Sequence, residues 1–500
     1  MTTHVELRRG AYHDSVSLMQ VSRAVAGTAG VAAAQVAMAT ELNVDVLRSM
    51  GFDVPDEAGP NDLVVAIRAD DPDGLDAGLA AVTDALAALR GTGDSGGGGG
   101  DDEVAPRTLG SAATRSGSTL AVISVPGQHA VTETFDAIAS GLSVMLFSDN
   151  VSVDDEVRLK DAAADADVLV MGPDCGTAHV GGVALGFANV VRPGSVGVVA
   201  ASGTGAQQVM CLLDAAGVGL SHCLGVGGRD LKAAVGGRST RQALRALADD
   251  PATETVLVVS KPPDDAVLAD IGSYAAELGL RVHWAVLGPG RPDLTEAIEA
   301  FLAAEGHKVP TWPVTLAAPE DPSLATGPSL RGLFCGGTLA DEAMTVAEAT
   351  LGSIRSNIAH TPELALAPGL TDPGHVVIDF GDDGLTRGRA HPMMDPTLRM
   401  ERIAREAADP TCGVLLLDLV LGHGAHPDPA GELADAVRSA RALAHADGRA
   451  LPVVVSLTGT DADPQNRARC AEALGAAGAS VFLSNGAATR HALDLLGSPR

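Results

Sequence analysis

The chain has 500 residues, of which 46% are hydrophobic and only 2% aromatic, so we expect several domains with cores of small aliphatic side chains. Its 63 acidic residues outnumber its 34 basic ones, giving a formal net charge of −29. This balance argues against nucleic acid or an anionic membrane as a partner, because phosphate groups are bound through clustered Lys and Arg. The sequence shows no signal peptide, no apolar run long enough to span a bilayer and no CxxC pair, so we expect a cytoplasmic protein.

The first 90 residues predict a small α/β module. An amphipathic helix is expected at Ser15–Ala26, a short helix further on, and a third helix at Gly74–Leu89, with strands at HVELRR, VAAAQVAM and DLVVAIRA. Residues 91–106, GTGDSGGGGGDDEVAP, are typical of a flexible linker because they have no side chains with which to pack.

The middle of the chain alternates strands with helices, which indicates parallel sheets covered on both faces. The turn VRPGS favours two domains, a truncated Rossmann-like domain at 107–191 and a flavodoxin-like domain at 192–303. Their predicted strands are TLAVISV, LSVMLFS, DVLVMG, SVGVVAA, TVLVVS and VHWAVLG.

A proline-rich linker at 304–330 leads into a last parallel-sheet domain at 331–500. Its predicted strands are GLFC, HVVIDF, GVLLLDLVLG, LPVVVSLTG and ASVFLSNG. In such sheets, ligands bind beyond the carboxyl ends of the strands, so the loops that follow these strands are the places to seek a site.

Three strand-to-helix junctions are candidates for binding an anion. Each is a strand end, a run of small residues and then an expected helix, at 202–205 (SGTG), 335–343 (CGGTLADEA) and 457–466 (LTGTDADPQN). The first amide N–H groups of a helix lack intrahelical acceptors and lie at the positive end of its dipole, so they suit phosphate or carboxylate. The alternative is a turn that only needs small residues. The phosphate-binding candidates are Ser202, Gly203, Thr204, Gly205, Gly336, Gly337 and Thr338.

Polar loops follow several other strands. Residues 379–399 carry a dense set of charged side chains, which favours carboxylate or phosphate recognition over a solvated loop with internal ion pairs. The catalytic candidates are Asp382, Arg389, His391 and His423, and the substrate-binding candidates are Lys261, Arg387 and Thr458.

Metal and cysteine chemistry have weaker support. His423 and His426 lack a third ligand nearby in the sequence, so we expect no metal. Cys175 and His179 fit a nucleophile pair, although a structural cysteine beside a Pro-Asp turn is the commoner case. Neither a Walker motif nor a dinucleotide GxGxxG is present, which argues against P-loop and NAD chemistry.

Several long motifs resemble the succinyl-CoA synthetase superfamily, and most closely its FdrA branch, the acyl-CoA synthetase FdrA family. VMGPDC, GSVGVVAASGTGAQQVM and GLSHCLGVGGRD are similar to the α subunit, while HVVIDFGDD, GVLLLDLVLGHGA and VVVSLTGTDAD are similar to the end of the β subunit. The likeness to FdrA lies in YHDSVSLMQVSRAVAG, SVPGQHA, VSKPP, LFCGGTLADEA and GRAHPMMDP.

The resemblance implies that two helices, one from each ligase-type domain, aim their amino ends at one phosphoryl group. Ser202, Gly203 and Thr204 would supply one end, and the loop with Gly422 and Gly424, residues 422–425, would supply the other. The chain departs from the synthetases in lacking the GHAGA histidine motif, the ATP-grasp domain and the GxTGxQG loop that holds the CoA nucleotide.

Three functions therefore stay open. The resemblance to FdrA implies a phosphate-dependent carbamoyltransferase subunit of allantoin catabolism, acting between oxamate and phosphate through carbamoyl phosphate, in a hetero-oligomer with partner subunits. The first alternative is a true ADP-forming acyl-CoA (succinate–CoA) ligase that uses CoA and ADP with Mg²⁺. The second is a non-catalytic subunit that only binds an anion.

Overall fold

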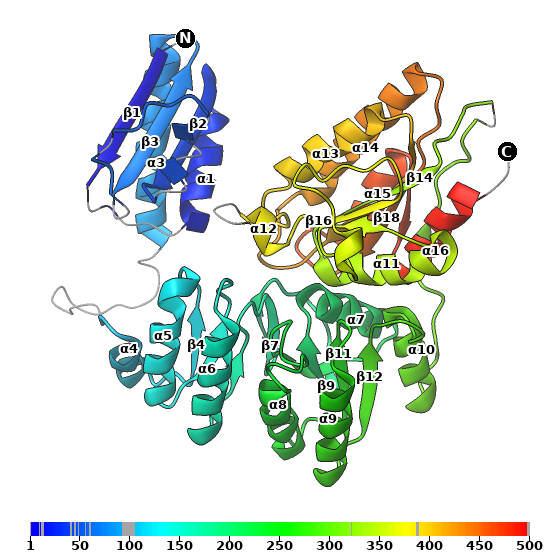
Figure 1. Ribbon diagram of the computed structural model, residues 1–500. Helices are drawn as coiled ribbons and strands as arrows, with labels where there is room; N and C mark the ends of the chain where they lie inside the picture. The colour runs from blue at the N-terminus through cyan, green and yellow to red at the C-terminus, as the bar shows by residue number, and fades with distance from the viewer. Residues whose placement is uncertain are drawn as a thin grey trace. The chain divides into compact units, whose positions relative to one another are not determined.

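The protein is described by a computed structural model covering residues 2–9, 11, 15–40, 43–44, 47–48, 50–55, 57–59, 62–92, 106–321, 323–386 and 390–497. Its contacts divide the chain into two compact units, one formed by Met1–Ala105 and the other by Pro106–Arg387 with His391–Arg500 (Figure 1). No helix among the described residues combines the length and the apolar character needed to cross a bilayer.

The first unit is a three-stranded antiparallel sheet with two long helices. Its elements are β1 (Thr2–Arg8), α1 (Ser15–Ala26), β2 (Val31–Met38), β3 (Leu63–Ala69) and α3 (Pro72–Thr92), and the strand order is β1-β3-β2. In the central strand, Leu63, Val65 and Ile67 pack with α1 and α3, whereas Val64 and Ala66 join a second apolar cluster. The apolar run of β3 is therefore continuous because both of its faces are buried. The short helix expected before β3 falls mostly outside the described residues.

The second unit begins with a small parallel sheet in the order β4-β5-β6. Capped helices flank this sheet: Thr108 and Ser152 accept hydrogen bonds from the first turns of α4 and α6. The elements are α4 (Leu109–Ser116), β4 (Leu120–Ile123), α5 (Gly127–Ala139), β5 (Ser143–Leu146), α6 (Val153–Asp165) and β6 (Val170–Met171).

A six-stranded sheet follows, in the order β12-β11-β9-β10-β7-β8. Its core strands are parallel, and only the β7–β8 hairpin runs antiparallel to its neighbours. Val198 and Ala200 of β9 face α7 and α10, while Val199 and Ala201 face α8 and α9. The elements are β7 (Thr177–Val180), β8 (Val183–Gly186), β9 (Pro193–Ala201), α7 (Gly203–Ala215), β10 (Leu220–Gly225), α8 (Arg238–Asp249), β11 (Thr255–Ser260), α9 (Asp265–Glu277), β12 (Val282–Val286) and α10 (Leu294–Ala304).

The six-stranded sheet includes strands that precede the domain boundary expected between residues 191 and 192. The β7–β8 hairpin precedes that boundary yet pairs with β10, so the six-stranded sheet begins at Thr177. Strand β10 was not among the predicted strands, because its sequence LSHCLG interrupts the apolar run with Ser221 and His222.

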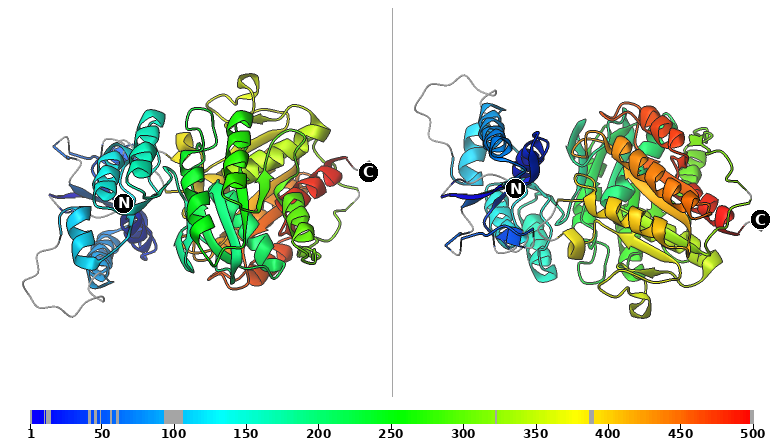
Figure 2. Two further views of the ribbon diagram at one scale, coloured as in Figure 1. Left: turned by 90° about the horizontal axis from the view of Figure 1, so that it is seen from below. Right: turned by 90° about the horizontal axis from the view of Figure 1, so that it is seen from above.

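The last sheet has seven strands in the order β13-β19-β18-β17-β14-β16-β15, all parallel except β13. Helices cover both of its faces (Figure 2). The short β13, at Val314–Thr315, comes from the segment expected to be only a linker. The other elements are β14 (Ser329–Phe334), α11 (Gly337–Leu351), β15 (Arg355–Ser356), η1 (Pro362–Leu364), β16 (Val376–Asp379), α12 (Asp383–Thr386), α13 (Thr397–Ala408), β17 (Cys412–Val420), α14 (Pro429–Ala446), β18 (Val453–Thr458), α15 (Arg467–Ala476), β19 (Ala479–Phe482) and α16 (Asn485–Gly497).

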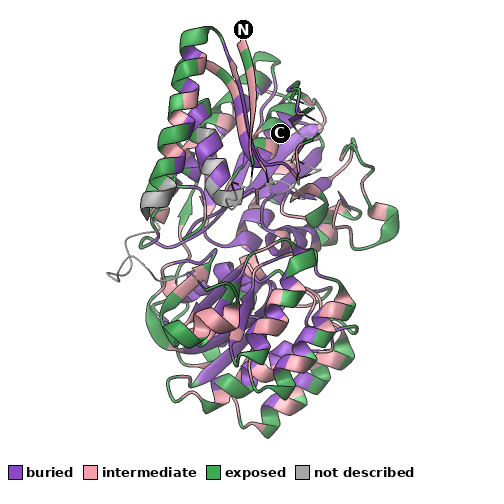
Figure 3. Cartoon of the chain, turned by 90° about the vertical axis from the view of Figure 1, so that its left-hand side faces the viewer, coloured by how far each residue is buried: buried purple, intermediate pink, exposed green. Residues whose placement is uncertain are grey.

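The two large sheets are joined through helices α7 and α10 on one side and α11 and α16 on the other. Figure 3 shows the strands of both sheets buried beneath helices whose outer faces are exposed. Buried polar contacts cross the joint: Gln208 Nε2 donates to Leu483 O at 2.8 Å, and Asn189 Nδ2 donates to Asp463 Oδ2 at 2.7 Å. The expected α/β class with parallel-sheet domains is confirmed.

Candidate functional site

Two helix amino termini meet where the large sheets join. Helix α7 follows β9 with Ser202 as its N-cap, and α11 follows β14 with Gly336 as its N-cap. The hydroxyl oxygens of Ser202 and Thr338 lie 2.7 Å apart, so the first turns of the two helices are in contact. A Cβ atom on Gly336 would lie only 2.9 Å from Thr204 Oγ1. Glycine is therefore required at Gly336 for this close approach.

The junction presents amide groups without internal acceptors. Ser202 Oγ accepts a hydrogen bond from the Gly205 amide at 2.9 Å. Among the described residues, no acceptor is bonded to the amides of Gly203, Thr204, Gly337 or Thr338. Because both helix dipoles also place positive potential here, the junction suits a small anion.

A lysine and a carboxylate stand at the start of α11. A Cβ atom on Gly337 would lie 2.5 Å from Asp379 Oδ2 and 3.0 Å from Lys261 Nζ. Lys261 follows β11 of one sheet and Asp379 ends β16 of the other, so both sheets contribute a charge to this position. Gly337 therefore keeps open the space that these two side chains border.

A second carboxylate fixes the backbone before α11. Asp418, buried in β17, accepts hydrogen bonds from the Cys335 and Gly336 amides, each at 2.8 Å, and from Arg399 Nη1 at 2.7 Å. The charge of Asp418 is thus used internally, and its role is to hold the turn that leads into α11.

The pKa values of three groups near the junction are shifted. Burial raises the pKa of Asp379 to about 6, against the opposing effects of Lys261 and of the Gly381 amide. Asp174 reaches solvent but is largely surrounded by protein, and this poor hydration, with the charge of Asp383, raises its pKa to about 7. Burial and the charge of Arg399 lower the pKa of His391 to about 4. Near neutral pH, the site thus combines a neutral imidazole with two carboxyl groups close to their titration points.

The structure places His391 and Asp382 in the loop that follows β16. The His391 ring lies 5.3 Å from that of Phe187, and its Nδ1 accepts a hydrogen bond from the Met393 amide. The proton of the neutral ring is therefore on Nε2, the atom that lies 2.9 Å from where a Cβ on Gly381 would be. Asp382 precedes α12, accepts a hydrogen bond from the Gly384 amide and helps to raise the pKa of Asp379.

The expected partner of α7 was wrong. Helix α14 begins at Pro429 with Asp428 as its N-cap, so residues 422–425, including Gly422 and Gly424, do not form a helix start. In this loop the amide of the exposed His423 donates to Ala188 O at 2.8 Å. The loop continues β17 into a bridge with residue 188, and the helix start opposite α7 is that of α11.

Other predicted groups have structural roles or are not described. Thr458 is buried, and its hydroxyl donates to Gln208 Oε1 at 2.8 Å across the joint between the sheets; its expected contact with substrate stays a prediction. Cys175 is buried, and burial raises the pKa of its thiol to about 12, so it is not an activated nucleophile. Arg387 and Arg389 lie outside the described residues, and their expected roles stay predictions.

Sequence reasoning overlooked Asp379 and Asp418. Both carried a signal, because each is a lone carboxylate at or near the end of an otherwise apolar strand, VVID or CGVLLLDLV. A buried charge needs partners, so such a residue marks a place where donors or cations gather.

Comparison with known proteins shows that the chain belongs to the CoA-ligase superfamily. A CoA-ligase family model matches residues 333–495, and a model for the AllF heavy metal-associated domain matches residues 1–104. The chain is 38% identical over 483 residues to the uncharacterized protein YahF of Escherichia coli, covering 93% of this chain and 92% of YahF. It belongs to the same family, the FdrA family.

More distant relatives match parts of the chain. The succinate–CoA ligase α subunit 2 of Archaeoglobus fulgidus is 29% identical over 148 residues, which cover 29% of this chain and 50% of that subunit. The match thus spans about half the length of such a subunit. A solved dinucleotide-forming acetyl-coenzyme A synthetase 1 of Ca. Korarchaeum cryptofilum is 15% identical, with a TM-score of 0.30, and covers 83% of this chain and 94% of that one.

The name of the first family model refers to a heavy metal, but the residues here do not fit one. The first cysteine of the sequence is Cys175, so residues 1–104 contain no thiolate ligand. The described residues also contain no group of three or more His, Cys, Asp or Glu that could hold a metal ion. We therefore derive no step that passes through a metal.

Proposed function

We propose that this chain is a subunit of a phosphate-dependent carbamoyltransferase that acts between oxamate and phosphate through carbamoyl phosphate. The observation that carries the proposal is the contact between the α7 and α11 amino termini, with Lys261 at its edge. Unpaired amides and a lysine are suited to hold the phosphate group of an acyl phosphate and to stabilise the charge that develops on it.

The chemistry needs a proton donor that is effective near neutral pH. When a phosphate oxygen attacks the carbamoyl carbon of N-carbamoyl-oxamate, the bond from that carbon to the oxamate nitrogen breaks. The nitrogen takes a proton and leaves as oxamate, while the carbamoyl group stays on phosphate as carbamoyl phosphate. Asp174 and Asp379, whose pKa values are raised to about 7 and about 6, are the candidate proton donors.

Lys261 is assigned to the phosphate group, so the oxamate carboxylate needs a second cation. Of the side chains expected to contact substrate, Lys261 is the one that lies beside the proposed phosphate position. Arg387 and Arg389 remain candidates from the sequence for the same carboxylate. We also propose that the chain works together with partner subunits and that it is cytoplasmic.

A second candidate is an ADP-forming acyl-CoA ligase, which the CoA-ligase family match at residues 333–495 favours. This function would require CoA and ADP with Mg²⁺. It would also require a phosphate carrier in place of the histidine of the GHAGA motif, which the sequence lacks.

Ligand binding separates the candidates. We expect carbamoyl phosphate and oxamate to raise the melting temperature of the full chain by mass action, and Lys261→Met to remove the effect of carbamoyl phosphate. Lys308→Met, which removes an exposed lysine elsewhere, is the matched control. Stabilisation by CoA and ADP alone, with covalent ³²P labelling from ATP, would establish the ligase instead. Stabilisation by phosphate alone would indicate a subunit that only binds an anion.

A further inference from the structure

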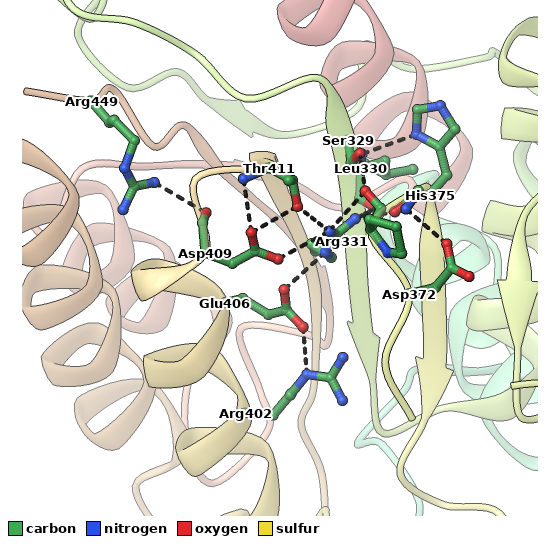
Figure 4. Close-up of polar contacts among 12 residues, drawn as sticks. Ser329, Leu330, Arg331, Asp372, His375, Arg402, Glu406, Asp409, Thr411 and Arg449 are labelled. Carbon is green, nitrogen blue, oxygen red and sulfur yellow. Dashed lines mark hydrogen bonds and ion pairs between the residues drawn. The ribbon is translucent and has the colours of Figure 1, made fainter. Parts of the chain in front are cut away.

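A polar cavity lies at the end of the seven-stranded sheet opposite the α7–α11 junction. It has a volume of about 440 Å³ and is bordered by residues 371–373, by the end of α13 and by Thr411. Strand β17 begins here at Cys412, whereas Asp418, which fixes the turn before α11, lies toward its other end. The cavity is therefore separate from the α7–α11 junction, and Figure 4 shows several of the side chains that line it, among them Arg402, Glu406 and Asp409.

The carboxylates that line this cavity are already neutralised. Glu406 accepts hydrogen bonds from Arg402 Nε and, at 2.9 Å, from Arg331 Nε. Asp409 accepts from the Thr411 amide at 2.8 Å and from Arg331 Nη2 at 3.3 Å. The fully buried Arg331 thus uses its charge on these two acids (Figure 4).

The third lining acid is engaged in the same way. Asp372 Oδ1 accepts from the Gly374 amide at 2.8 Å, and its Oδ2 pairs with Arg355 Nε at 2.9 Å. Every lining carboxylate is therefore bonded through both oxygens, which leaves little negative potential directed into the cavity.

The lining arginines, in contrast, keep unused donors. The side chain of Arg402 is only 8% exposed, yet among the described residues it bonds only through Nε, to Glu406. Arg405, one helical turn further along α13, is exposed and forms no ion pair with any described residue. A guanidinium held in a largely buried position with its Nη atoms free is suited to bind an oxyanion through two parallel hydrogen bonds.

We propose that this cavity binds a small molecule through a phosphate or carboxylate group held by Arg402 and Arg405. The volume falls within the range of small-molecule pockets, so it has room for more than the anionic group itself. The site is notable in a chain with a net charge of −29, because the local balance favours an anion where the overall charge repels one. The proposal does not depend on the carbamoyltransferase function, since it uses none of the residues of the α7–α11 junction.

The test is hydrogen–deuterium exchange of the full chain with inorganic phosphate, ADP and oxamate as separate probes. We expect at least one probe to slow exchange in the peptides that cover residues 371–374 and 397–411. Protection by phosphate and ADP but not oxamate would identify a phosphate ligand, and protection by oxamate alone a carboxylate ligand. If no probe protects these peptides, or if every probe protects only residues 202–206 and 336–340, the proposal is wrong.

Variants assign any protection to the arginines. Arg405→Ala should weaken the binding that protects residues 397–411 at least tenfold, without lowering the melting temperature, because Arg405 is exposed. Arg405→Lys should weaken it less, because the charge stays and only the forked geometry is lost. Arg438→Ala on α14 removes an exposed arginine elsewhere and is the matched control. Equal binding by Arg405→Ala and Arg438→Ala would overturn the assignment.

Discussion

The starts of α11 and α15 look alike in the sequence but differ in the folded protein. Both follow a buried strand and a run of small residues. Before α15, the Thr460 amide donates to Asp463 Oδ2 at 2.8 Å, and Asn466 caps the helix by accepting from the Arg469 amide at 3.0 Å. Before α11, in contrast, no side chain caps the helix. Asp461 also accepts from the Ala468 amide in the first turn of α15 at 3.1 Å, so side chains of this loop take the donors that at α11 stay open to an external anion.

The sequences of the two loops, once compared, explain this difference. The loop GTDADPQN contains two aspartates and a capping asparagine within reach of its own amides, whereas the turn CGGT contains no acidic side chain. Short polar residues that bond to nearby backbone compete with any ligand for the same donors. A glycine-rich junction therefore predicts an anion site only where its own loop carries no acid.

The largest expected loss of stability comes from the loop before α15, whose donors are bonded to its own side chains. Asp463→Ala removes one acceptor from each of three donors: Asn189 Nδ2, which keeps its bond to Leu421 O, the partly buried Val190 amide and the buried Thr460 amide. We expect the free energy of unfolding to fall by about 3 kcal/mol, since each unpaired buried donor is costly. Urea unfolding followed by circular dichroism measures the change.

The control for this variant is Asp461→Ala, two residues earlier in the same loop. Asp461 is exposed, pairs with Arg467 and accepts a hydrogen bond from the Ala468 amide in the first turn of α15 at 3.1 Å, so its removal should cost only about 1 kcal/mol. Similar losses for the two variants would show that the Asp463 carboxylate is not what fills this junction.

At the α7–α11 junction, where several amides have no internal acceptor among the described residues, a substitution should change the affinity for phosphate instead of the stability. Gly337→Ala puts a methyl group 2.5 Å from the present position of Asp379 Oδ2 and 3.0 Å from that of Lys261 Nζ. We expect phosphate to bind at least about tenfold more weakly there, a loss of about 1.4 kcal/mol. The measurement is phosphate-dependent exchange protection of residues 336–340, so that binding elsewhere does not interfere.

A matched alanine variant exists on the facing helix. A Cβ atom on Gly203 would meet only Thr177 Oγ1, at 3.6 Å, which is an ordinary contact. Gly203→Ala should therefore keep the amide donors and the phosphate affinity. If both variants bind phosphate as the unmodified chain does, the ligand is not held between α7 and α11.

Most of the fold can be predicted from the sequence because the pattern of apolar residues in each predicted strand matches the burial of that strand in its sheet. Strands such as DLVVAIRA and GVLLLDLVLG are continuous apolar runs, and the structure buries them on both faces. Strand β10 escaped prediction because Ser221 and His222 interrupt its run, and β13 because it is only two residues long. Their pairing depends on neighbouring strands from distant parts of the chain.

The site was predictable in part. The small residues at 202–205 and 336–338 lie where the sequence placed them, but which helix starts face each other depends on how the two sheets pack. Residues 422–425 were paired with α7 by resemblance, and only the position of Asp428 as the N-cap of α14 shows that no helix begins there. Packing between sheets leaves no periodic signal in the sequence.

A third helix start, that of α10, completes the comparison, because carboxyl groups of the protein itself accept the hydrogen bonds of its first amides. Glu342 of α11 accepts a hydrogen bond from the Leu294 amide at 2.7 Å and another from Asn485 Nδ2 at 2.6 Å, while Asp293 caps the same helix. Burial, with the negative charge of Asp293, raises the pKa of Glu342 from 4.5 to about 8. Glu342 is therefore mostly protonated near neutral pH.

This protonation gives the most specific expected effect. Between pH 4.5 and 8 the folded chain holds a proton on Glu342 that the unfolded chain has lost, so stability from this group falls as the pH rises, by at most about 1.4 kcal/mol per pH unit. Glu342→Gln removes the titration and should flatten the pH dependence of the unfolding free energy between pH 5.5 and 7.5. The raised pKa values of Asp174 and Asp379 act in the same direction in both proteins, so they cancel in the difference. An unchanged slope would mean that Glu342 is ionised at the α10 start and occupies it as a charged acceptor.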